Sequence, residues 1–142
     1  MILADIKKIL SEDGMFVSTT SGVCMYPLLR DRRDTVIVTP TAKRLKKYDV
    51  ALFLRGDSYV LHRVIKVLPD SYLIRGDNCI MSDKVMDADI LGKLTGIYRG
   101  DKKIDMQGRG YKTYSRLIVF FSPIVRLKLR LKFIFNRIKN KK

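Results

Sequence analysis

A run rich in β-branched and aromatic residues occupies positions 59–68 and reads Tyr59-Val60-Leu61-His62-Arg63-Val64-Ile65-Lys66-Val67-Leu68. This composition is typical of a strand, and the Pro69-Asp70 pair directly after it indicates a turn. Similar runs lie at residues 35–39, 49–54, 71–74 and 90–98, separated by turn-forming residues. We therefore predict a mainly β domain of about five to seven strands.

The segment that precedes the strands has a different period. Ile2, Ile6, Ile9 and Leu10 recur at helical spacing, and Asp13-Gly14 follows them, which predicts a short amphipathic helix over residues 2–12. The chain then divides into an N-terminal helix (1–14), a β domain (15–100) and a C-terminal extension (101–142). With 142 residues, 46% of them apolar, it can bury a single core.

The C-terminal extension carries most of the charge. Residues 99–142 hold 14 Lys and Arg against Asp101 and Asp105, a net charge of +12, which leaves +3 for residues 1–98. Such a segment suits an anionic partner, and we expect Arg126, Lys128, Arg130 and Lys132 to contact an anionic membrane surface. Apolar and basic residues nearly alternate over 124–135, as in a strand, yet the same letters give an apolar helical face. Periodicity leaves both forms open.

Three short motifs carry groups that suit amide hydrolysis. They are Ser21-Gly22-Val23-Cys24-Met25-Tyr26-Pro27, then Leu61-His62-Arg63-Val64, and then Gly76-Asp77-Asn78 with Asp83. Hydrolysis needs an activated nucleophile, a base that returns its proton to the leaving amine, and donors for the oxyanion. Cys24 can attack, and the single histidine, His62, can transfer the proton. An imidazolium beside Cys24 would also favour a reactive thiolate.

In their order along the chain and in their residues, these motifs resemble the signal peptidase I superfamily, which includes the LexA-type self-cleaving repressors. The resemblance covers about residues 18–98 and is to the histidine branch found in the endoplasmic reticulum and in archaea. It implies a signal-peptidase/LexA-like β domain with a short N-terminal helix and a basic C-terminal extension. The family nucleophile is a serine, whereas this chain has Cys24. A single sequence leaves open whether that cysteine is natural or engineered.

The resemblance also implies roles for further residues. Asp83 or Asp77 would orient His62, with Asp83 preferred, since Asp77 can instead stabilise its own turn. Cleft and oxyanion positions fall on four residues of the first motif: Ser21, Gly22, Met25 and Pro27. We expect a peptidase that cleaves an extended peptide or precursor segment, with no cofactor and no metal.

Several alternatives stay open. Cys79 is expected to be a buried structural residue, although a Cys24–Cys79 disulfide would silence the nucleophile. The fold could also be a catalytically silent module that binds a peptide or a membrane surface. Nucleic acid is not the expected partner, because the tail has few aromatics for base stacking and no DNA-reading motif precedes the strands.

Hydropathy leads to an expected location. No stretch approaches the roughly 18–20 apolar residues that cross a bilayer, and the N-terminal residues lack the apolar core of a secretory signal. We expect a cytoplasmic protein that is held peripherally at the inner membrane face by its tail.

Overall fold

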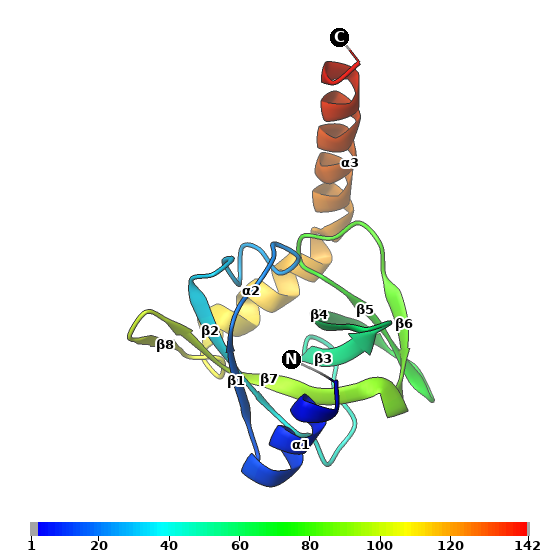
Figure 1. The fold of residues 1–142 in the computed structure, drawn as a ribbon. Helices are drawn as coiled ribbons and strands as arrows, with labels where there is room; N and C mark the ends of the chain where they lie inside the picture. The colour runs from blue at the N-terminus through cyan, green and yellow to red at the C-terminus, as the bar shows by residue number, and fades with distance from the viewer. Residues whose placement is uncertain (1–2, 142) are drawn as a thin grey trace.

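The computed structural model describes residues 3–141 and is mainly β, with a curled antiparallel sheet (Figure 1). The eight strands follow the order β1-β2-β7-β3-β4-β5-β6, and β8 pairs with β7. The strands are β1 (Phe16–Thr19), β2 (Asp34–Thr39), β3 (Val50–Arg55), β4 (Ser58–Val67), β5 (Ser71–Arg75), β6 (Asp83–Met86), β7 (Ile90–Arg99) and β8 (Lys102–Ile104). The helices are α1 (Leu3–Asp13), α2 (Arg109–Phe120), α3 (Ser122–Lys139) and a single 3-10 turn, Asp87–Asp89.

All five strands predicted from the sequence are present. The expected number of five to seven was too low, because the short strands β1, β6 and β8 also join the sheet. These three have only three or four residues each, so they carry too little periodicity to stand out in the sequence. The predicted N-terminal helix is α1, and Ile2 of that prediction lies outside the described residues.

The extension beyond residue 108 is helical, so the helix interpretation of its pattern is the correct one. α2 packs against the domain through Tyr111 and Tyr114, which contact a core cluster. Figure 1 shows α3 projecting away from the sheet, and no residue of α3 is buried.

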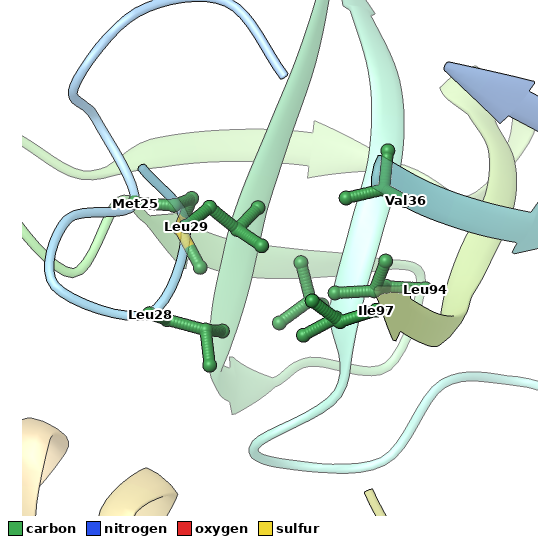
Figure 2. Close-up of a cluster of buried hydrophobic side chains, with 7 residues drawn as sticks. Met25, Leu28, Leu29, Val36, Leu94 and Ile97 are labelled. Carbon is green, nitrogen blue, oxygen red and sulfur yellow. The ribbon is translucent and has the colours of Figure 1, made fainter. Parts of the chain in front are cut away.

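The core connects the sheet to the loop that carries Cys24. Figure 2 shows Met25, Leu28 and Leu29 from this loop facing Val36 of β2 and Leu94 and Ile97 of β7. All six side chains are buried. Burial of such side chains contributes about 1.5–3 kcal/mol each, so the residues around Cys24 are held firmly by the core.

Candidate active site

Cys24 lies in the loop between β1 and β2, next to buried Met25. Gly22 adopts a φ of +89°, and its N–H donates to the Asp31 carboxylate at 2.8 Å, which fixes the turn before Cys24. The Cys24 side chain is exposed. Among residues 3–141 its backbone N–H has no hydrogen-bond partner, so this donor is free for an oxyanion.

The turn that follows β5 holds this loop in place. Asn78 donates its backbone N–H to the Cys24 carbonyl at 2.9 Å and its side-chain amide to the Val23 carbonyl at 3.1 Å. Gly76 allows the close approach. A Cβ there would lie 2.6 Å from the Cys24 carbonyl oxygen, 2.6 Å from Cys79 Sγ and 3.0 Å from His62 Nε2. The Gly76-Asp77-Asn78 motif therefore assembles the site by backbone contact.

Cys24, His62 and Cys79 form a compact cluster. The two sulfurs and one imidazole nitrogen all lie within 4.8 Å of one another. Cys79 Sγ is 3.9 Å from His62 Nε2, and both cysteines are free thiols. The sequence predicted a structural role for Cys79 and left a Cys24–Cys79 disulfide open, whereas in the structure both thiols are free and Cys79 lies beside the imidazole. The signal for it was its place directly after the Gly-Asp-Asn motif.

His62 is buried on β4, with 1% of its surface exposed. Burial, reinforced by the positive charge of Arg55, lowers the pKa of His62 to about 4, against the smaller opposing effects of Asp83 and Asp77. The imidazole is therefore neutral at pH 7 and able to accept a proton. This differs from the thiolate–imidazolium pair expected from the sequence, because burial disfavours the imidazolium.

Asp83 and Arg55 both approach the other imidazole nitrogen. Asp83 Oδ2 lies 4.0 Å from His62 Nδ1, while an Arg55 guanidinium nitrogen lies 3.4 Å from the same atom and also contacts Asp83. The carboxylate is near enough to take up the Nδ1–H after a small movement. Unliganded sites often show such loose geometry.

Asp77 is engaged elsewhere. Its two carboxylate oxygens accept hydrogen bonds from Arg63 at 2.8 and 2.9 Å, and Tyr114 donates to it at 2.8 Å. Arg63 is fully buried and also donates to the Tyr48 carbonyl and to Ser115. Of the two aspartates that the sequence left open, Asp83 is the one near Nδ1, whereas Asp77 ties the turn to β4 and α2.

A cavity of about 360 Å³ opens beside Cys24. Its lining includes Ser21, Gly22 and Met25, together with residues of α1 and β1–β4, and most of it is apolar. Pro27 lies outside the cavity, after the cis peptide bond that follows Tyr26. Arg55 also lines this space, which brings a cation to a mostly apolar cleft.

Sequence reasoning missed several groups that complete the site. Arg55 ends β3 and looked like turn punctuation, and Tyr114 and Ser115 belong to the extension, which the sequence treated as separate from the chemistry. Their contacts with Asp83, Asp77 and Arg63 depend on tertiary packing. No short-range pattern predicts them.

Comparisons with known proteins leave the family open. No protein-family model matches the chain, and neither does any curated protein.

The tail residues expected to meet a membrane lie on α3, whose first turn borders the turn after β5: Ser122 and Val125 line a small pocket together with Gly76 and Cys79. Lys128, Arg130 and Lys132 are exposed, whereas Arg126 is half-buried. No helix among residues 3–141 combines the length and apolar character needed to cross a bilayer.

Proposed function

We propose that this protein is a thiol endopeptidase with a signal-peptidase-like fold, which cleaves an extended peptide or precursor segment. One observation carries the proposal: an exposed thiol and a buried, neutral imidazole lie within 4.8 Å of each other at the edge of an apolar cavity. A nucleophile with a base nearby is the arrangement that covalent catalysis needs.

In the proposed mechanism Cys24 Sγ attacks the scissile carbonyl while His62 Nε2 accepts the thiol proton. The Cys24 N–H stabilises the oxyanion, and the imidazolium returns the proton to the leaving amine, which leaves a thioester. Water, deprotonated by His62, then hydrolyses the thioester and restores the thiol. Arg55, which can only donate, would leave Nδ1, and Asp83 would then accept the Nδ1–H and so hold the tautomer in which Nε2 is the acceptor.

The outer edge of β1 supports recognition of an extended substrate. β1 pairs only with β2 among the described strands, and its residues Phe16, Ser18 and Thr19 line the cavity that Cys24 borders. A peptide added along this edge would pass the thiol, with small or apolar side chains entering the cavity. This would be a substrate segment unfolded near its cut site.

The test is a peptide library incubated with full-length protein, kept reduced and with a chelator present, and analysed by mass spectrometry. We expect cuts at one defined position in extended peptides and a covalent adduct on Cys24 with a thiol-directed peptide electrophile. Absence of both cleavage and adduct would reject the peptidase and favour a silent peptide-binding module.

The pH dependence follows from the neutral imidazole. Because the His62 pKa is lowered to about 4, the base stays unprotonated down to that pH, and kcat/KM should fall only below it rather than near the ordinary value of about 6.5. Replacing Arg55 by Gln removes a charge that lowers this pKa, so the acid limb of the profile of kcat/KM against pH should move to higher pH. Asp83→Asn removes a charge that raises it and should move the limb downward. Limbs that stay in place in both variants would contradict the assigned base.

A second function, association with an anionic membrane surface, is favoured by α3. The helix has no acidic residue, and its apolar stripe of Ile124, Leu127, Leu131, Ile134 and Ile138 is exposed. With about 100° per residue, Arg126, Arg130 and Arg137 flank one side of this stripe and Lys128, Lys132 and Lys139 the other. Helices with this pattern lie in the membrane interface. We propose a peripheral position at the inner membrane face.

Neutralising basic residues on both sides of the apolar stripe should weaken vesicle binding. Each basic residue near an anionic surface contributes about 1 kcal/mol, so the triple change Lys128→Gln, Arg130→Gln and Lys132→Gln should lower partitioning on the order of 100-fold. Flotation with anionic and zwitterionic vesicles measures the partitioning. The triple change Lys43→Gln, Lys46→Gln and Lys47→Gln removes the same charge from a loop and should have a small effect. Equal losses in both variants would refute α3 as the contact.

A further inference from the structure

The second thiol in the site has no part in the proposed hydrolysis. Cys79 is half-buried, yet its sulfur lies 3.9 Å from the imidazole nitrogen that faces Cys24, and it also approaches the Cys24 carbonyl oxygen at 3.8 Å. A core packing role alone does not require a thiol beside an exposed thiol and an imidazole. The arrangement matches a different chemistry.

Two sulfurs and one imidazole nitrogen are the donor set that Zn²⁺ and similar soft cations prefer. We infer that Cys24, His62 and Cys79 form a binding site for a soft divalent cation of the Zn²⁺ type, and that the bound cation blocks the thiol. The cation binding stands on the cluster itself, whereas its inhibitory effect rests on the proposed peptidase function.

The distances allow this coordination with small movements. Tetrahedral zinc with sulfur at about 2.3 Å and nitrogen at about 2.0 Å places two sulfurs and a nitrogen roughly 3.5–3.8 Å apart. Here the three atoms lie within 4.8 Å of one another, and Cys79 Sγ and His62 Nε2 are already 3.9 Å apart. The remaining gap is about 1 Å at most, and the exposed Cys24 side chain has the most room to move.

The surroundings supply the other requirements of such a site. His62 Nδ1 faces Asp83 at 4.0 Å, and a carboxylate behind a ligating imidazole orients it and raises its basicity. The three ligands come from the β1–β2 loop, β4 and the turn after β5, so the fold and not one flexible segment gathers them. Because Cys24 is exposed, the fourth position is open to water or to a substrate group.

Binding releases thiol protons to solvent, since the ligands are thiolates. With both sulfurs bound, the cation withdraws negative charge from the Cys24 sulfur and makes it a weaker nucleophile, and Nε2 cannot accept a proton. Metal binding and peptide cleavage would therefore exclude each other. The cavity beside the cluster remains open, so loss of activity would arise at the thiol and not from a closed cleft.

Titration of the full-length, reduced and metal-free chain with Co²⁺ tests the site without any substrate. We expect thiolate-to-cobalt charge-transfer absorption and intense tetrahedral d–d bands, which stoichiometric Zn²⁺ abolishes. Because loss of even an outer partner costs about 10–100-fold in affinity, Cys79→Ser and His62→Gln should each weaken Zn²⁺ binding at least 100-fold in competition with a chromophoric chelator. Asp57→Asn, an exposed turn variant, serves as the control and should bind as the wild type does.

Weak octahedral Co²⁺ bands in the wild type, or Zn²⁺ affinity unchanged in both ligand variants, would overturn the site. If the wild type cleaves peptide, Zn²⁺ should inhibit it and a chelator should restore it, while Cys79→Ser should lose much less of its own activity at the same Zn²⁺ concentration. Tetrahedral binding without any peptidase activity would uphold the cation site and count against the proposed function alone. Equal inhibition of the wild type and Cys79→Ser would overturn the inhibitory role.

Discussion

Replacing Cys24 by alanine is expected to lower kcat/KM for peptide cleavage by about 10⁴-fold or more, as loss of a nucleophile does in enzymes that act through a covalent intermediate. Cys24 is exposed at the edge of the cavity, where a scissile carbonyl can reach it. Its neighbour Cys79 is half-buried, and burial together with the adjacent Cys24 raises the pKa of the Cys79 thiol to about 11. A thiol that stays protonated at neutral pH is a poor nucleophile.

Cys79→Ser is the matched control for this substitution. It removes the other sulfur of the cluster at nearly constant size, and its kcat/KM should stay within about tenfold of the wild type, since only positioning near His62 changes. Mass-spectrometric mapping of alkylation should find Cys24 modified first in both the wild type and Cys79→Ser. If Cys79→Ser and not Cys24→Ala caused the large loss of kcat/KM, Cys79 would be the nucleophile in place of Cys24.

Replacing Asp77 by asparagine is expected to lower the free energy of unfolding by about 3–5 kcal/mol, because it leaves the buried Arg63 charge without its counter-ion. Arg63 is fully buried, and both of its bonds to the carboxylate are lost or weakened. The carboxylate also accepts the Tyr114 hydroxyl from α2. Since small domains are stable by about 5–15 kcal/mol, this is a large fraction of the total.

Urea unfolding followed by circular dichroism measures this loss, and Asp87→Asn is its control. Asp87 pairs with Arg44 at the surface at 3.0 Å, with both side chains partly exposed, and such pairs contribute about 0–1 kcal/mol. The two aspartate–arginine pairs have similar distances, but the loss in free energy of unfolding should be severalfold larger for Asp77→Asn than for Asp87→Asn. Equal effects would mean that the Asp77 pair does not hold the turn to β4 and α2.

The sequence predicted the elements with strong local signals and missed those set by packing. The run 59–68 predicted β4, and the resemblance carried by the three motifs indicated that Cys24, His62 and Asp83 belong to one site. Nothing local tied Tyr114 and Ser115 to Arg63, which is 52 residues from Ser115 in sequence. The neutral state of His62 also depends on burial, which periodicity alone does not measure.

The C-terminal extension shows the same difference between what the local pattern predicts and what packing decides. Alternating letters over 124–135 satisfied a strand and a helix equally, and the choice depends on whether a partner strand is within reach. In the structure β8 pairs with β7, the chain then forms α2, and the basic segment follows as α3.

The lack of a side chain at Gly76 limits how this site can change over evolutionary time. Since the turn touches the Cys24 carbonyl, the Cys79 sulfur and the His62 imidazole at once, no side chain can be introduced there without moving all three groups. New reactivity must then arise by exchanging the functional groups at positions 24, 62 and 79, while position 76 stays fixed as the common point of contact.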